Sequence, residues 1–197
     1  MKQFKIGITG GIGTGKSTVS KILIALGYPV YFSDDRAKWL MENNQQLVAD
    51  LTRLLGDETY KAGKLNRSFI AEKLFSNSQL KKKINELVHP VVRNDFNDWA
   101  DTQEAPLLFQ ESALLVETGA YQLFDALIVI TAPLEQRIQR IQKRDGISIN
   151  EINMRLTNQL AESEKIAVAD YVISNDDYQP IVFQIQKIVG ELLKQIN

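Results

Sequence analysis

The sequence contains no cysteine and a single histidine, His89. The lack of cysteine excludes disulfides, thiolate metal sites and cysteine nucleophiles. One histidine cannot build a multi-histidine metal site, and it leaves a Ser-His-Asp triad with only one possible base. A chain without cysteine fits a reducing compartment, and we expect a cytoplasmic protein.

Long apolar runs and an excess of one charge are also missing. No stretch approaches 18 consecutive apolar residues, and the start of the chain, MKQFKIGITG, lacks the apolar segment of a signal peptide. The 23 Lys and Arg residues nearly balance the 24 Asp and Glu residues, giving a net charge of −1. These features argue against membrane insertion and against electrostatic binding of nucleic acid or lipid surfaces. The 44% of hydrophobic residues is too high for a disordered chain.

Short apolar runs alternate with longer amphipathic segments along the 197 residues. Alternating or continuous apolar residues predict strands at 4–8, 30–32, 107–109, 126–131 and 171–174. Apolar residues at helical spacing follow the first run and fill the end of the chain from about Ile181. Alternating strands and helices predict an α/β fold, with a five-stranded parallel sheet between two helical layers.

Two helical regions are longer than a simple strand connection requires. They cover about residues 47–99, where no strand is evident, and about 133–169. We therefore predict one domain without a linker, whose core consists of residues 1–46, 101–133 and 170–197. A substrate-binding helical insertion at about 47–100 and a helical lid at about 134–169 complete it.

The segment Gly10–Thr18 matches the phosphate-binding loop G-x-x-x-x-G-K-[ST], between a predicted strand and a predicted helix. Glycines let the backbone wrap a phosphate with its N–H groups pointing inward. Lys16 adds a charge for the β- and γ-phosphates, Ser17 offers a hydroxyl to Mg²⁺, and the helix dipole favours the anion. The motif predicts binding of ATP with Mg²⁺, and its predicted ATP ligands are Gly11, Gly13, Thr14, Gly15, Lys16, Ser17 and Thr18.

The loop alone does not define the reaction. A GTPase would carry N-K-x-D after a later strand, but Ala132-Pro133-Leu134-Glu135 follows residues 126–131. The small size and the two helical regions favour a kinase for a small molecule. Two alternatives stay open: a kinase for a different small acceptor, and an ATP-binding switch without catalysis.

Carboxylates follow two of the predicted strands, where ligands of open α/β sheets bind. Asp34 could take a proton from an acceptor hydroxyl or orient Mg²⁺ through water, or it could simply cap a helix that begins near Asp35. Glu111 could reach Mg²⁺ through water. Glu117, in the segment after the same strand, could belong to the site, or it could be an ordinary acid on a helix surface.

Arg137, Arg140 and Arg144 are spaced to share one helix face. Such a face can clamp a polyphosphate and neutralise charge on the transferred group. The alternative is a solvated face paired with Glu135 and Asp145, but the phosphate-binding loop favours function for at least one arginine.

His89 precedes Pro90, which disfavours α geometry at the histidine and predicts a helix end there. A neutral histidine at such a place is more often a cap or a buried hydrogen-bonding residue than a catalyst.

With these residues in view, the chain resembles the dephospho-coenzyme A kinase family over nearly its whole length. Two of its features are more particular than a bare phosphate-binding loop: the opening Thr9-Gly10-Gly11-Ile12-Gly13 and the placement of the His89-Pro90 pair. The segments that carry it are residues 8–17, 34–37, 87–90, 114–117, 137–145, 155–159 and 169–175.

The resemblance implies transfer of the γ-phosphate of ATP to the 3′-hydroxyl of the ribose of dephospho-CoA, the last step of coenzyme A synthesis. It implies a fold like that of nucleoside-monophosphate kinases, and no obligate protein partner is evident. It also implies residue roles: Asp34 at the acceptor hydroxyl, Arg140 and Arg144 at the phosphates, Asn175 near adenine, and His89, Lys38 and Glu117 on the CoA side.

The chain departs from the family pattern at four positions. The family often has Asp-x-Asp and then Ala-Arg where this chain has Phe32-Ser33-Asp34 and Ala37-Lys38. Lys38 keeps the charge of an arginine but loses its two-pronged contact. The family often has Asp and Pro at the positions aligned with Glu111 and Ala113.

Overall fold

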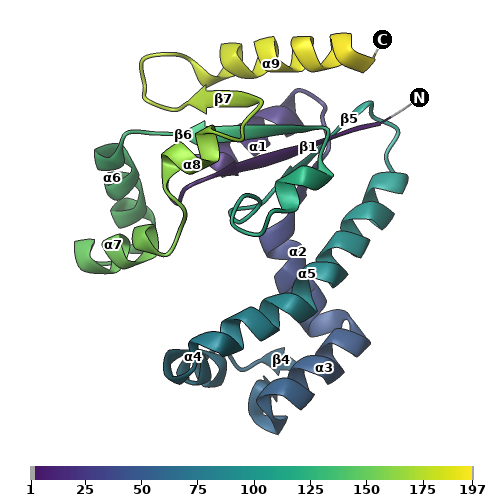
Figure 1. The fold of residues 1–197 in the computed structure, drawn as a ribbon, viewed down its shortest axis with the longest axis vertical. Helices are drawn as coiled ribbons and strands as arrows, with labels where there is room; N and C mark the ends of the chain where they lie inside the picture. The colour runs from purple at the N-terminus through teal and green to yellow at the C-terminus, as the bar shows by residue number, and fades with distance from the viewer. Residues whose placement is uncertain (1–2, 197) are drawn as a thin grey trace. The chain divides into compact units, whose positions relative to one another are not determined.

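The computed structural model describes residues 3–196, apart from the side chains of residues 75, 76 and 78. The chain forms two compact units (Figure 1). The core unit comprises the chain up to Phe32 and from Gln103 onward, and the helical unit comprises Ser33–Thr102.

A five-stranded parallel sheet forms the centre of the core unit, in the order β2-β5-β1-β6-β7. Its strands are β1 (Phe4–Gly10), β2 (Val30–Phe32), β5 (Leu107–Glu111), β6 (Ala126–Thr131) and β7 (Tyr171–Ser174). The predicted parallel α/β sheet is therefore confirmed. Because all five strands run in one direction, their carboxyl ends lie at the same edge, where Ile8 of β1 is in register with Glu111 of β5.

Helices cover the two faces of this sheet. On one face, α1 (Lys16–Ala25) and α9 (Ile181–Ile196) pack against the inward side chains of β1, β5 and β6 (Figure 1). On the other face, Leu127 and Val129 contact Leu115 and the segment around Val168. The remaining elements of the core unit are the 3₁₀ turn η2 (Ala120–Leu123), α6 (Leu134–Asp145), α7 (Ile149–Thr157) and α8 (Glu162–Ile166).

The helical unit begins earlier than the insertion predicted from about residue 47. It includes α2 (Ser33–Asn43), because α2 packs on α5 and α3 and Arg36 forms an ion pair with Asp95. The other helical elements are α3 (Gln45–Leu55), η1 (Asp57–Thr59), α4 (Arg67–Ser76) and α5 (Ser78–Asp101). A short hairpin, β3 (Tyr60–Lys61) with β4 (Lys64–Leu65), also interrupts this region, which we expected to be helical throughout.

The helix end predicted at His89 is wrong, because α5, which is 24 residues long in all, runs through Pro90 to Asp101. Proline removes one backbone donor and crowds the preceding turn, so this continuation needs compensation. Val88, Val92 and Phe96 are buried at helical spacing on either side of Pro90. The burial of this apolar face outweighs the local cost of the proline.

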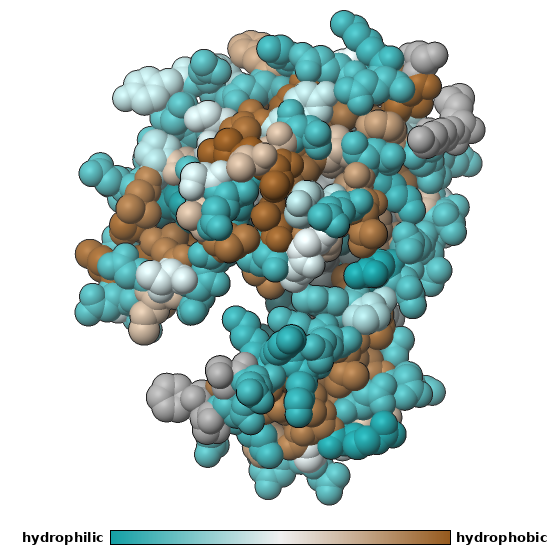
Figure 2. Space-filling view, viewed as in Figure 1, coloured by the Kyte–Doolittle hydropathy of each residue, from teal (hydrophilic) through white to brown (hydrophobic). Residues whose placement is uncertain are grey.

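Hydrophilic residues cover most of the face shown in Figure 2, and hydrophobic residues form separate patches within each unit. Within residues 3–196, no helix has the length and apolar character needed to cross a membrane.

Candidate active site

The loop between β1 and α1 has the backbone of a phosphate-binding loop. Gly13 and Gly15 have φ values of 80° and 98°, in the left-handed region that favours glycine, and Gly15 caps the N-terminus of α1. A Cβ on Gly10 would overlap the carbonyl oxygen of Ile130 on the neighbouring strand. The fold of the loop thus requires these glycines, and the loop leads directly into the N-terminus of α1, an end of a helix that favours anions.

Polar side chains of the loop support this conformation. The ammonium group of Lys16 donates to the carbonyl oxygens of Gly10 at 2.9 Å and Gly11 at 3.2 Å. The buried Thr14 donates its hydroxyl to the same Gly11 oxygen at 2.9 Å. Ser17 is exposed in the first turn of α1, where its hydroxyl is accessible to a ligand.

Asn175, directly after β7, lies against the start of α1. Its side chain is buried, and its Nδ2 donates to the carbonyl oxygen of Thr14 at 2.7 Å. A Cβ on Gly15 would overlap this amide. The structure therefore brings the predicted adenine-side residue Asn175 to the junction between the loop and the helix.

The three arginines of α6 have different environments. Arg140 donates from Nη2 to Gln136 Oε1 at 3.0 Å and to the carbonyl oxygen of Asn175 at 3.2 Å, and its buried Nη1 has no hydrogen-bond partner within residues 3–196. Arg144 is exposed and pairs with Asp145 at 2.7 Å. Arg144 therefore lies on a solvated face and is paired with Asp145, as the alternative interpretation expects, whereas Arg140 binds the backbone of Asn175 directly after β7.

Arg137 is the arginine that contacts the phosphate-binding loop. Its side chain is 11% exposed, and Nε donates to the carbonyl oxygen of Ile12 at 3.0 Å. Burial lowers the pKa of Arg137 from its usual value, and Glu162 partly offsets that effect. The spacing of the arginines pointed to a shared face, but it could not single out Arg137.

Gln159 is a loop contact that sequence reasoning missed. Its Oε1 accepts a hydrogen bond from the backbone N–H of Ile12 at 2.9 Å. The position belongs to the segment 155–159 that supports the family resemblance, but nothing in the local pattern linked it to a loop 147 residues away.

Glu111 is the last residue of β5 and is half-buried at the strand edge beside β1. It lies in the sheet directly next to the strand that leads into the phosphate-binding loop. The described residues hold no group of three or more His, Cys, Asp or Glu side chains able to hold a metal ion.

The interpretation of Glu117 as a surface acid is wrong. Glu117 forms an ion pair through Oε1 with Lys165 of α8, whose side chain is 1% exposed. Its Oε2 is buried and has no hydrogen-bond partner in the described part of the chain. Sequence reasoning also missed Lys165, because a lysine in a short charged helix predicts a solvated side chain.

The helical unit carries the remaining candidates. Helix α2 begins at Ser33, so the exposed Asp34 lies in its first turn and does not cap a helix that starts near Asp35. Lys38 pairs with Asp35 at 2.9 Å on the exposed face of α2. His89 is half-buried within α5, where burial lowers its pKa and the nearby Arg93 lowers it further.

A glycine loop of this geometry, on the carboxyl edge of a five-stranded parallel sheet with helices on both faces, defines a protein of the P-loop nucleotide-binding class. A shikimate kinase from Acinetobacter baumannii shares the fold, with a TM-score of 0.52 at 16% identity and 98% and 94% of the two chains covered.

Closer relatives define the family. The family model described as dephospho-CoA kinase matches residues 4–180. Curated dephospho-CoA kinases from Bacteroides fragilis and Porphyromonas gingivalis are 37% and 40% identical, covering 98% and 93% of this chain and 95% and 92% of theirs. The structure of a dephospho-CoA kinase from Campylobacter jejuni matches with a TM-score of 0.70 at 27% identity, covering 97% of this chain and 98% of that one. The chain belongs to the dephospho-CoA kinase family, which catalyses the final step of coenzyme A biosynthesis with ATP.

Proposed function

We propose specific roles for the residues of this chain in transferring the γ-phosphate of ATP to the 3′-hydroxyl of dephospho-CoA. The observation that carries the proposal is the loop conformation, in which Gly13 and Gly15 have left-handed φ values and Lys16 lies across the loop. The triphosphate binds the loop at Gly11 and at residues 13–18, while the N–H of Ile12 stays on Gln159, and Asn175 contributes to the adenine side.

Charge that develops on the transferred group is neutralised by Lys16 and Arg140. The buried, unpartnered Nη1 of Arg140 supports this role, because a buried guanidinium donor costs stability unless it finds an acceptor. Arg144 joins the phosphate ligands by exchanging Asp145 for an oxygen of ATP. These arginines belong to the proposed lid, residues 134–169, which excludes water from the reaction.

The donor set suits a Mg²⁺ ion carried by the nucleotide. Mg²⁺ keeps several waters and takes one or two protein oxygens together with substrate phosphates. The exposed hydroxyl of Ser17 and the carboxylate of Glu111, the latter acting through water, are such oxygens. When bound, the ion would neutralise charge on the β- and γ-phosphates.

Asp34 accepts the proton of the 3′-hydroxyl. It follows the last residue of β2 by two positions, and ligands of open parallel sheets bind beyond the carboxyl ends of strands. We assign the acceptor to the helical unit, with Lys38 and His89 among its contacts, and to Glu117 through its remaining oxygen Oε2. The proposal places the reaction in the cytoplasm and needs no protein partner, since every group named belongs to one chain.

The replacement Asp34→Asn tests the assignment of the base. It should lower kcat by about 10²- to 10⁴-fold and leave the far-UV circular dichroism spectrum unchanged. Asp98→Asn, an exposed acid of α5 in the same unit, serves as the matched control and should retain the activity. Near-normal turnover of Asp34→Asn would remove the base role, and an equal loss in both variants would show a general effect of charge.

A further inference from the structure

Both backbone polar groups of Ile12, at the apex of the phosphate-binding loop, are bound by side chains from the segment Leu134–Ile166. The N–H of Ile12 donates to Gln159 Oε1 at 2.9 Å. The carbonyl oxygen of Ile12 accepts from Arg137 Nε at 3.0 Å. One residue of the loop is thus fixed from two sides by groups that lie far away in the sequence.

Arg137 also packs closely against the glycines that flank Ile12. A Cβ on Gly11 would overlap the Nη2 end of the guanidinium, and a Cβ on Gly13 would lie 2.9 Å from the carbonyl oxygen of Arg137. Gly11 has no positive φ, so the guanidinium, and not the backbone angle, is what leaves no space for a side chain there.

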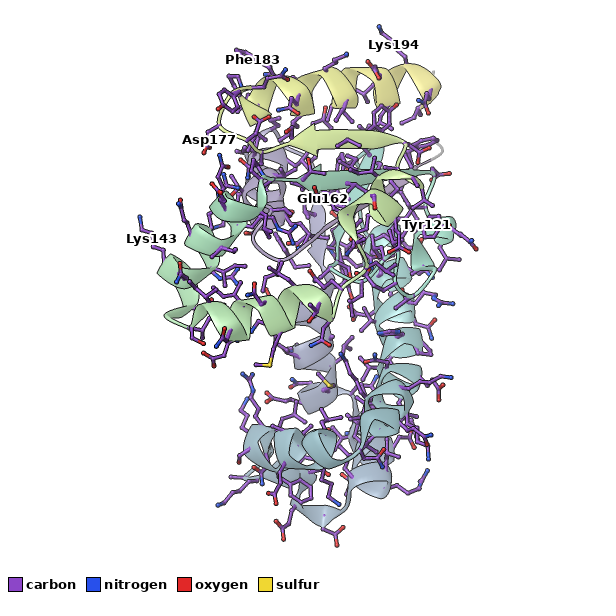
Figure 3. All side chains as sticks on the ribbon, turned by 60° about the vertical axis from the view of Figure 1, so that its left-hand side comes forward. Tyr121, Lys143, Glu162, Asp177, Phe183 and Lys194 are labelled. Carbon is purple, nitrogen blue, oxygen red and sulfur yellow. The ribbon has the colours of Figure 1, made fainter. Side chains whose placement is uncertain are left out.

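A carboxylate completes the arrangement on the other side of the arginine. Glu162 Oε2 accepts from Arg137 Nη1 at 3.4 Å, and Figure 3 shows Glu162 at the start of α8. Lys143 of the same helix as Arg137 points outward in that view. The burial of Arg137 is thus particular to its position on α6 and is not a feature of the whole helix.

A glycine-rich loop loses more conformational entropy on ordering than other segments do. If the apex is already held, nucleotide binding does not bear that cost, and affinity rises accordingly. Two hydrogen bonds to the backbone of one residue, on the two peptide groups that flank its Cα, together with a packed guanidinium, are suited to hold the apex in advance.

We propose that Arg137, Gln159 and Glu162 form a clasp on Ile12 that pre-orders the phosphate-binding loop and thereby sets the affinity for ATP. The three are positioning residues, because they act through the loop backbone. The proposal deepens the proposed function, on which it rests for the identity of the nucleotide, and it makes the α6–α8 segment a determinant of ATP affinity.

The first test compares Gln159→Met, which keeps the side-chain size but removes the acceptor, with Asn158→Ala at the exposed neighbouring position. Binding of ATP is measured calorimetrically without acceptor, and kcat and KM are measured with dephospho-CoA. We expect Gln159→Met to raise the Kd and KM for ATP about five- to tenfold, with kcat within about twofold of the original chain. Asn158→Ala should match the original chain.

The second readout is amide hydrogen exchange over residues 10–14 without nucleotide. Exchange there should be faster in Gln159→Met and should return to the original rate when ATP is added. Gln159→Glu keeps an acceptor oxygen for the Ile12 N–H and should retain slow exchange. A purely structural role for Gln159 would not produce this split between the two variants.

Arg137→Ala gives an independent test, with Lys143→Ala as the control for loss of a positive charge on the same helix. We expect faster loop exchange and weaker ATP binding in Arg137→Ala only. If Arg137→Ala does not fold, Gln159→Met decides. Unchanged ATP affinity and unchanged exchange in Gln159→Met would overturn the clasp. If the variants show these effects on ATP binding but the original chain forms no CoA, the proposed function fails and the clasp stands.

Discussion

Removing the charge of Lys165 should destabilise the core unit strongly. Lys165 is 1% exposed, and its partner Glu117 is 14% exposed, so both charges are largely removed from water. The replacement Lys165→Met keeps a flexible side chain of similar length and leaves the Glu117 carboxylate buried without its cation.

The magnitude follows from this burial. Breaking a buried ion pair by removing one partner typically costs about 3–5 kcal/mol, because an uncompensated charge stays in the interior. With a urea m-value of about 2 kcal/mol/M, the unfolding midpoint should fall by about 2 M. The double variant Lys165→Met/Glu117→Leu leaves no buried charge, and it should recover to within about 1–2 kcal/mol of the original chain.

Urea unfolding should be followed by far-UV circular dichroism. The two tryptophans, Trp39 and Trp99, both lie in the helical unit, so their fluorescence would not report directly on the core unit. Lys187→Met, at an exposed position of α9, controls for the loss of a lysine and should shift stability by less than about 0.5 kcal/mol. The reasoning is refuted if Lys165→Met loses less than about 1 kcal/mol, or if the double variant is as unstable as the single one.

Two further predictions concern the loop and the histidine. Gly13→Ala should weaken ATP binding at least about tenfold in calorimetry, because φ at Gly13 is 80° and the new Cβ would meet the carbonyl oxygen of Arg137 at 2.9 Å. Gly190 lies in open space within α9, so the matched replacement Gly190→Ala should instead stabilise the chain by about 0.5–1 kcal/mol. Burial, and then Arg93, lower the pKa of His89 below its usual 6.5 in the folded chain, so the unfolded chain binds a proton more readily and stability falls as pH drops below 6.5. His89→Gln should flatten this part of the stability–pH curve, and an unchanged curve would contradict the argument.

The sequence predicted the sheet because its signals are local. Each strand is a short apolar run, and the run Ala126–Thr131 corresponds to the whole of β6. The helix through Pro90 was missed because its cause is tertiary: burial of Val88, Val92 and Phe96 outweighs the local preference of the residue before a proline.

The residues of the candidate site likewise divide into those that local sequence patterns predict and those that only the folded chain brings together. Lys16 and Ser17 could be proposed from the sequence because the motif places them next to the glycines that shape the loop. Gln159 and Lys165 were missed because their partners lie 147 and 48 residues away, and only the folded chain brings them together. Periodicity and motif spacing carry no information about such contacts.

The most direct test of the account is the product balance with Mg·ATP and a panel of acceptors: dephospho-CoA, AMP, adenosine and a sugar acid. The account predicts ADP with dephospho-CoA alone, matched mole for mole by CoA that carries the new phosphate on the 3′-oxygen. ADP formed with another acceptor in place of dephospho-CoA would contradict the assignment of the substrate. No acceptor-dependent ADP from a chain shown to bind ATP would contradict the account as a whole.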